Sequence, residues 1–220
     1  MTALGTDAVL DAVLADRRLL DHPFYRRWEA GGLTREELAG YAAQYRHFEA
    51  YLPRFLADLV ASLPQGPARA LVAANLADEL GDPEPHIELF ERFAGAVGAP
   101  DAAPSPAMAN LLSVHDDLLA AGPRAGLAGF LAYECQADEV ARAKAEGLRT
   151  HYGLGEGAVS FWAHHAEVDA RHGEWAGAAL ASMAGPGEEV EGSVRRAADA
   201  WWAFLDERNA DRPLAESLAN

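Results

Sequence analysis

The chain has 220 residues, half of them hydrophobic, and carries 34 acidic against 18 basic side chains, a formal net charge of −16 at pH 7. A surface this negative repels phosphate backbones and anionic lipid, so we expect neither nucleic acid nor a membrane as a partner. No apolar stretch reaches the roughly 18 residues of a spanning helix, and a single cysteine excludes an internal disulfide. We therefore expect a cytoplasmic protein with a single domain over residues 1–220.

Helix signals recur along the chain, whereas the alternating Val, Ile and Thr runs of strands are almost absent. Thr34 and Glu37 have the spacing of a capping box at the start of a long helix, which Pro53 interrupts. The sequence predicts an all-α bundle of seven or eight helices. Their expected ranges are 7–20, 34–63, 68–81, 84–97, 107–120, 124–151, 157–184 and 188–208.

Three potential metal ligands follow one another in the predicted helix over 157–184. His165, Asp169 and His172 stand at i, i+4 and i+7, so their side chains share one helix face. Two imidazoles and a carboxylate suit iron, manganese or zinc. A solvated helix with ordinary surface histidines explains this segment equally well when it is considered alone.

Two other segments offer partners for these ligands. Glu79 and His86 are seven residues apart, but Gly81-Asp82-Pro83 lies between them, so a capped helix junction explains this pair more simply. Glu134 follows the apolar run 127–133 and should point inward, although an exposed helix edge would also accommodate it. Together the three segments supply three carboxylates and three imidazoles, a mixture typical of dinuclear centres in helical bundles. The lack of cysteine ligands argues against structural zinc and iron–sulfur sites.

In this order the residues resemble the pattern of the haem-oxygenase-like diiron oxidases. That pattern is a Glu and a His about seven apart, a Glu on a later helix, and then His-x3-Asp-x2-His. The resemblance implies a haem-oxygenase-like bundle that binds two transition-metal ions, Fe/Fe or Fe/Mn, and uses dioxygen and an external reductant. It implies six metal ligands: Glu79, His86, Glu134, His165, Asp169 and His172.

A closer resemblance is to the self-sacrificing para-aminobenzoate synthases, a family whose chlamydial members associate with death domains. The similar stretches are His22-Pro23-Phe24-Tyr25-Arg26-Arg27-Trp28, the segment 32–38, Tyr41-Ala42 and Tyr133-Glu134-Cys135-Gln136. In that family an internal tyrosine supplies the aromatic ring and an internal lysine is implicated as the source of the amino group. The resemblance implies these two roles for Tyr25 and Lys144, with Tyr41 and Tyr133 as further active-site tyrosines.

Lys144 also stands out without the resemblance, because it is the only lysine beside seventeen arginines among the 18 basic residues. An amine can lose its proton near neutral pH and a guanidinium cannot, so one retained lysine suits a need for an amine. A plain surface lysine and, for Tyr25, an aromatic at the core edge with its hydroxyl in water are the alternatives. We expect Cys135 to be a buried small hydrophobic residue.

Other functions stay open at this point. The same scaffold could act as an oxidase or oxygenase on an external small molecule, which the metal ligands fit equally well, although Tyr25 and Lys144 favour para-aminobenzoate. Cofactor-free relatives that form quinones or hydrolyse thiamine lack the full ligand set. A non-catalytic interaction protein would not need an inward-facing polar set, because buried carboxylates without partners destabilise a core. We expect dioxygen as a partner, a small-molecule substrate only in the first alternative, and allow for a homodimer.

Overall fold

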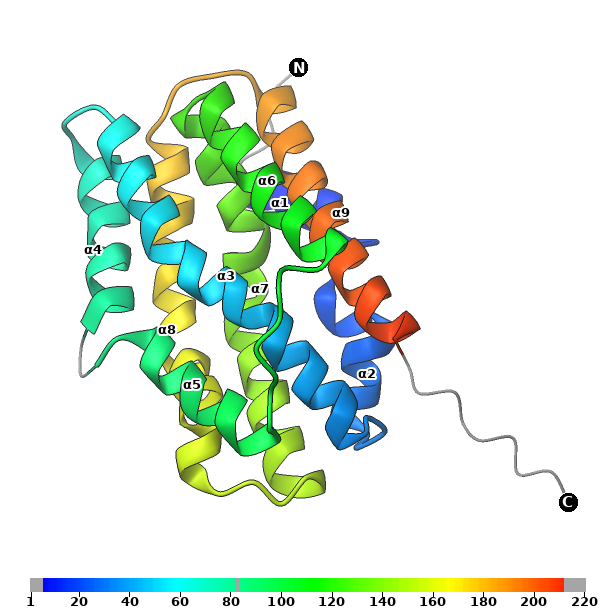
Figure 1. Ribbon diagram of the computed structural model, residues 1–220. Coiled ribbons are helices and arrows are strands. Elements are labelled where there is room, and N and C mark those ends of the chain that lie inside the picture. Colours follow the sequence, from blue (N-terminus) through cyan, green and yellow to red (C-terminus); the bar gives the residue numbers. More distant parts are fainter. Residues whose placement is uncertain (1–5, 82–83, 212–220) are drawn as a thin grey trace, which may run out of the picture.

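The computed structural model describes residues 6–81 and 84–211. In these residues all regular secondary structure is helical, with nine α-helices and one short 3₁₀-helix (Figure 1). The predicted all-α class is therefore confirmed, with one helix more than expected. The additional helix is α2, Pro23–Glu29, which begins where the first predicted helix was expected to end. Pro23 suits the first turn of a helix, and His22 caps it by accepting a hydrogen bond from the Phe24 amide at 3.1 Å.

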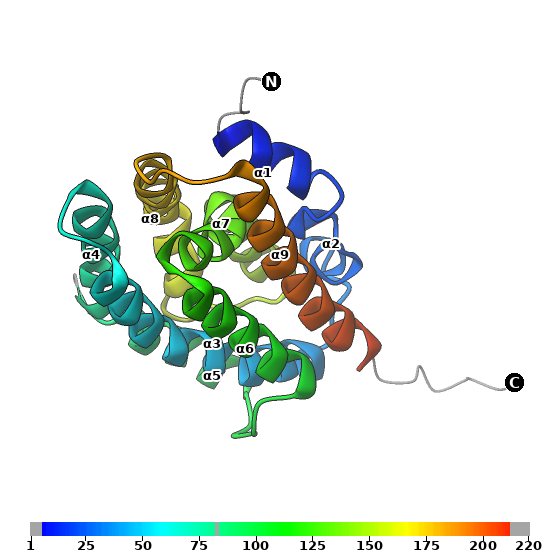
Figure 2. The same ribbon diagram turned by 90° about the horizontal axis from the view of Figure 1, so that it is seen from above.

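The long helices form the body of the bundle, and α7 packs against both α8 and α9 (Figures 1 and 2). Helix α3 crosses this body and contacts α4, α5 and α6. The first predicted helix is shorter than expected, because α1 ends at Leu14 and the 3₁₀-helix η1 follows after a turn. The remaining bounds are α1 Thr6–Leu14, η1 Leu19–Asp21, α3 Arg35–Ser62, α4 Pro67–Gly81, α5 His86–Val97, α6 Pro106–Ala121, α7 Pro123–His151, α8 Glu156–Ala181 and α9 Gly187–Ala210.

The predicted capping box at the start of α3 is present. The Thr34 hydroxyl accepts from the Glu37 amide at 3.2 Å, and the Glu37 carboxylate accepts from the Thr34 amide at 2.8 Å. Arg27 also donates to Glu37 at 2.7 Å, which ties α2 to the beginning of α3. Pro53 lies inside α3, and the helix continues through it to Ser62.

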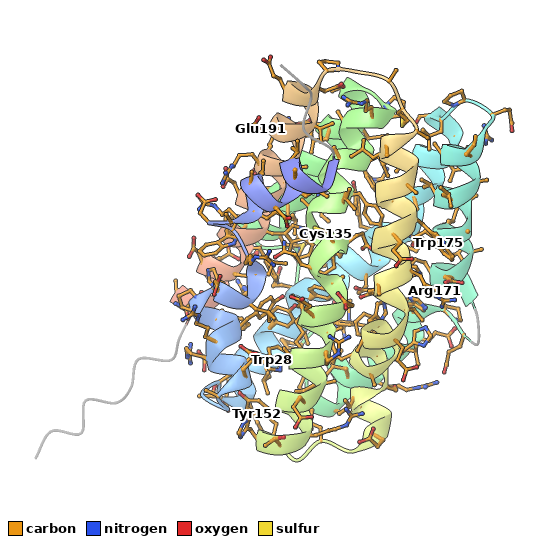
Figure 3. The ribbon with its side chains drawn as sticks, turned by 180° about the vertical axis from the view of Figure 1, so that it is seen from behind. Trp28, Cys135, Tyr152, Arg171, Trp175 and Glu191 are labelled. Atoms are coloured by element: carbon orange, nitrogen blue, oxygen red, sulfur yellow. The ribbon has the colours of Figure 1, made fainter. Side chains whose placement is uncertain are left out.

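Two expectations from the sequence have different outcomes here. The predicted break at Gly81-Asp82-Pro83 falls between α4 and α5, and Asp82 and Pro83 themselves lie outside the described residues. The expectation that Cys135 is buried is wrong, because its side chain is exposed on α7 and borders a surface pocket together with residues of α1 (Figure 3). Of the helices that the structure describes, none combines the length and the hydropathy needed to cross a membrane.

Gly173 sets how closely α8 approaches α7. A Cβ atom there would lie 3.1 Å from the Glu134 carbonyl oxygen, whereas a Cβ at Gly177, one turn later, would meet no atom within 4 Å. We expect Gly177→Ala to stabilise the protein by up to about 1 kcal/mol, because alanine is the better helix former. Gly173→Ala should be about 1–3 kcal/mol less stable than Gly177→Ala, since backbone atoms of α7 must give way. Urea unfolding of the two metal-free variants measures this, and equal stabilities would contradict the close contact.

Candidate active site

The three ligands predicted near the C-terminus lie in one continuous helix, α8, and all three are buried. The His172 Nδ1 atom faces carboxylates, at 3.7 Å from an oxygen of Asp169 and 4.0 Å from an oxygen of Glu134. Ordinary surface histidines, the alternative that the sequence left open, are therefore not what the structure shows. The face of α8 that carries these residues points into the bundle.

Glu79 and His86 also meet, although not on one helix face. Glu79 belongs to α4 and His86 is the first residue of α5, and the chain between these helices brings His86 Nδ1 to 2.9 Å from Glu79 Oε2. The other oxygen, Glu79 Oε1, lies 3.7 Å from His172 Nδ1. Ligand atoms of Glu79, His86 and His165 all lie within 4.8 Å of one another. Glu79 therefore faces two groups of ligands, one with each carboxylate oxygen.

In each of the three ligand histidines, one ring nitrogen faces the cluster and the other lies within hydrogen-bond distance of a partner outside the cluster. His172 Nε2 donates to Asp78 at 3.1 Å, which leaves Nδ1 for the cluster. His165 Nδ1 donates to the Phe161 carbonyl at 2.8 Å, which leaves Nε2. His86 Nε2 lies 3.1 Å from His164 Nε2, and one of these two nitrogens must donate to the other. Outer partners of this kind fix the orientation and tautomer of metal-ligating histidines.

Two buried atoms of the cluster are not satisfied by hydrogen bonds. Among the described residues, Glu134 Oε2 and His86 Nδ1 have no aligned hydrogen-bond partner. Burial, and then the charge of Glu79, raises the pKa of Glu134 well above its usual range, and burial with Glu134 does the same to the pKa of Asp169. Burial lowers the pKa of His165 to about 3, which keeps its imidazole neutral and its lone pair available. Unsatisfied carboxylates beside neutral imidazoles fit divalent cations.

A further carboxylate and a further tyrosine of this site were not predicted from the sequence. Glu49 and Tyr45 of α3 line one small cavity together with Tyr133, Glu134 and residues of α4 and α8. Tyr41, Tyr45 and Glu49 stand at i, i+4 and i+8, so they form a stripe along one face of α3. This spacing is the sequence signal for Glu49, because a glutamate in line with two tyrosines on one helix face indicates that its side chain points inward.

Lys144 is buried in an aromatic cage beside this cavity. Its side chain is 1% exposed, and Nζ donates to the Tyr41 hydroxyl at 2.8 Å. Nζ also lies 3.9 Å from the centre of the Trp162 ring and 4.7 Å from the centre of the Tyr25 ring. Burial lowers the pKa of Lys144 well below its usual range, only partly offset by the charges of Glu49 and Asp169. The surface position that the charged sequence context allowed is therefore excluded.

Helix α2 contributes Tyr25 and Trp28 to the cage. The Trp28 indole donates to the Lys144 carbonyl at 3.2 Å, and Figure 3 labels Trp28 on α2. The Tyr25 hydroxyl lies 2.8 Å from the Tyr41 hydroxyl, so Tyr25 is buried and not exposed to water at a core edge. Neither Tyr25 nor Tyr41 lines the cavity, in contrast to Tyr133.

A line of four tyrosines connects the cavity with Tyr25. The Tyr133 and Tyr45 hydroxyls are 2.7 Å apart, and the Tyr45 and Tyr41 rings stack with their centres 5.3 Å apart. The hydrogen bond between Tyr41 and Tyr25 completes the line. The structure thus joins the three predicted tyrosines through Tyr45, in direct contact with Lys144.

The buried amine should destabilise the folded protein in a pH-dependent way. Because the folded-state pKa of Lys144 is lowered, the unfolded chain binds more protons between that pKa and about pH 10.4, so stability rises with pH over this window. Lys144→Met should raise the free energy of unfolding of the metal-free protein at pH 7, by about 1.4 kcal/mol for each pH unit between about 10.4 and the folded-state pKa of Lys144, or between about 10.4 and 7 where that pKa lies below 7. The gain should shrink as the pH approaches 10. Denaturant unfolding at both pH values measures the difference, and a constant gain would contradict a proton-linked cost.

Comparison of the sequence with models of known protein families identifies the family to which the chain belongs. A family model for haem-oxygenase-like, iron-containing redox enzymes matches residues 39–205. The chain belongs to this family. The match contains the whole carboxylate and histidine cluster and Lys144, whereas Tyr25 precedes it. This haem-oxygenase-like protein is accordingly an oxidoreductase.

Characterised relatives extend the similarity over most of the chain. A 4-aminobenzoate synthase of Nitrosomonas europaea is 34% identical over 90% of this chain and 88% of its own length. A 4-aminobenzoate synthase of Chlamydia muridarum is 30% identical over 90% of this chain and 87% of its own length. Among solved structures, a TenA homologue from Pseudomonas syringae superposes with a TM-score of 0.79 over 93% of both chains at 15% identity. The predicted haem-oxygenase-like fold and family resemblance are confirmed.

Proposed function

We propose that this haem-oxygenase-like enzyme is an oxygen-dependent 4-aminobenzoate synthase that takes the ring from its own Tyr25 and the nitrogen from Lys144. The contact between the two residues carries the proposal, since the amine lies 4.7 Å from the Tyr25 ring centre and both residues hydrogen-bond to Tyr41. The relatives named 4-aminobenzoate synthase support the same product.

The atoms of Tyr25 fit the product. In tyrosine the hydroxyl and Cβ are para to each other, as are the amino and carboxyl groups of 4-aminobenzoate. The Tyr25 ring and Cβ would therefore supply the ring and the carboxyl carbon, with cleavage of the Cα–Cβ bond and oxidation of Cβ by dioxygen. The Lys144 nitrogen would replace the phenol oxygen, which would leave as water, and the Cε–Nζ bond of Lys144 would break. The lowered pKa of Lys144 favours the neutral amine, which is the nucleophilic form.

We further propose that the cluster holds two transition-metal ions, Fe/Fe or Fe/Mn, with Glu79 facing both. When bound, these ions would supply the site at which dioxygen is reduced with electrons from an external reductant. The line of four tyrosines would let an electron pass from Tyr25 to the cluster although Tyr25 lies outside the cavity, because each tyrosine contacts the next. The proposed ligands are the six inferred from the sequence: Glu79, His86, Glu134, His165, Asp169 and His172.

The size of the cavity favours an internal substrate over an external one. It offers about 10 Å³ of room for the centre of a water molecule, which is about what a single water needs. An aromatic substrate from solution would have to displace core residues such as Phe48 or Trp162, which line this cavity. Tyr25 needs no such entry, because its ring is already part of the core.

Isotope labelling tests the proposal directly. Protein made from ring-labelled tyrosine and side-chain ¹⁵N-lysine is purified, loaded with iron and manganese without oxygen, and then exposed to air and a reductant. The released 4-aminobenzoate should carry both labels, at no more than one molecule per chain. Mass changes in the protein should be confined to the peptides that contain Tyr25 and Lys144. Unlabelled product, or many turnovers on an added small molecule, would favour the external-substrate oxidase.

A further inference from the structure

Glu49 is a buried carboxylate to which neither the family pattern nor the proposed chemistry assigns a role. Its side chain is 4% exposed and lines the cavity beside Glu79, Glu134, His165 and Asp169. It enters from α3, a helix that carries none of the six proposed ligands. Glu49 therefore approaches the cluster from a direction that would otherwise be lined only by aromatic and aliphatic side chains of α3.

Glu49 differs from the other buried glutamates in having no basic partner. Glu37 lies 2.7 Å from Arg27, Glu79 lies 2.9 Å from His86, and Glu134 lies 4.0 Å from His172. Throughout residues 6–81 and 84–211, no lysine, arginine or histidine nitrogen lies within 4.0 Å of the Glu49 oxygens. Burial, and then the charge of Glu79, raises the pKa of Glu49 well above its usual range. A buried carboxyl of this kind is seldom kept unless it is paired or binds a cation.

We infer that Glu49 is a seventh ligand of the metal centre, an inference that rests on the metal ions of the proposed function. Three ligand carboxylates would leave two divalent ions with a net positive charge inside the protein, whereas a fourth carboxylate balances it. An electrically neutral centre is the cheaper one to bury, because an uncompensated charge in a medium of low dielectric constant carries a large desolvation cost.

The alternative role for Glu49 is a counter-charge for Lys144. The contacts of the amine speak against it, because Lys144 Nζ is held by the Tyr41 hydroxyl and by aromatic rings. No carboxylate of the described residues forms an ion pair with Lys144 within 4.0 Å. Glu49 acts at longer range on Lys144, and its cavity-facing position points to the cluster instead.

Cobalt binding without oxygen tests the inference independently of catalysis. Wild-type protein, Glu49→Gln and Glu37→Gln are titrated with Co²⁺, the affinities are obtained by chelator competition, and the visible absorption of the bound ion is recorded. Glu37→Gln is the matched control, since it removes a buried carboxylate from the same helix but far from the cluster. Glu49→Gln should weaken one of two equivalents at least about tenfold and change its spectrum. Glu37→Gln should be less stable than the wild type, because it weakens the contact with Arg27. It should keep the wild-type affinity for both equivalents of Co²⁺.

Wild-type affinities and an unchanged spectrum in Glu49→Gln would overturn the inference, and would be expected if Glu49 served only Lys144. Should Glu49→Gln not fold, Glu49→Asp keeps the charge and withdraws the carboxylate by one methylene, so it must show the same spectral change. If the wild-type protein bound no Co²⁺, both the proposed metal centre and the role of Glu49 as its ligand would be excluded. Tight Co²⁺ binding, together with no 4-aminobenzoate from iron- and manganese-loaded protein given air and a reductant, would count against the proposed reaction alone.

Discussion

Tyr25→Phe should bind its metal ions normally and release no 4-aminobenzoate. Phenylalanine keeps the ring volume in the core but removes the hydroxyl group. Without the hydroxyl, the ring is no longer a phenol that can donate one electron, and it has no oxygen for the nitrogen to replace. The hydroxyl that is lost hydrogen-bonds to Tyr41, so stability should fall by only about 1 kcal/mol. Chromatographic quantification of the product after one aerobic reaction measures the effect against about one equivalent from the wild type.

Tyr51→Phe is the matched control for this variant. Tyr51 is another buried tyrosine of the same bundle, and its hydroxyl donates to Asp116 at 3.0 Å, away from Lys144. Tyr51→Phe should lose similar stability and keep the wild-type yield. Lys144→Arg should fail like Tyr25→Phe, because a guanidinium cannot readily give up a nitrogen. Full yield from either Tyr25→Phe or Lys144→Arg would exclude the corresponding residue as a source of product atoms.

Glu134→Ala should reduce the bound metal from two equivalents to one. The Glu134 carboxylate has a buried oxygen without a hydrogen-bond partner among the described residues, and it lies 4.0 Å from His172. Its loss should weaken the metal-binding capacity of its neighbours Asp169 and His172 and leave the group of Glu79, His86 and His165 intact, so that one equivalent would remain. Elemental analysis after anaerobic loading and desalting gives the stoichiometry.

Cys135→Ala provides the neighbouring control, because Cys135 is exposed on another face of α7. This variant should retain both equivalents and the wild-type yield. Two equivalents in Glu134→Ala would remove Glu134 from the centre. Loss of both equivalents would instead indicate that the two ions bind cooperatively.

The sequence predicted best where the site lies within a single helix. His165, Asp169 and His172 meet on α8 because helical periodicity fixes their common face. Glu79 and His86 meet for a different reason from the one their spacing suggests, since they belong to two helices, α4 and α5, and not to one helix face. That contact is tertiary, and only the resemblance to known ligand sets pointed to it.

Burial was the property that local sequence predicted least well. Lys144 lies among Arg142 and Glu146, a pattern typical of a solvated face, yet it is fully enclosed by residues from α2, α3 and α8. Cys135 shows the opposite error, because free cysteines are usually buried, whereas this side chain is exposed. Helix α2 could not be predicted from the sequence, because its seven residues are too few to show a clear helical periodicity of apolar residues.

The aromatic cage has a consequence for the reactivity of the chain towards acylating agents. Lys144 carries the only side-chain amine, and folding removes it from solvent. Acetyl and succinyl donors, sugars and aldehydes that modify exposed lysines therefore meet no exposed side-chain amine on the folded protein. The nitrogen that we assign to the product is thereby protected from acylation in the folded chain, and acylation of Lys144 would report the loss of this enclosure.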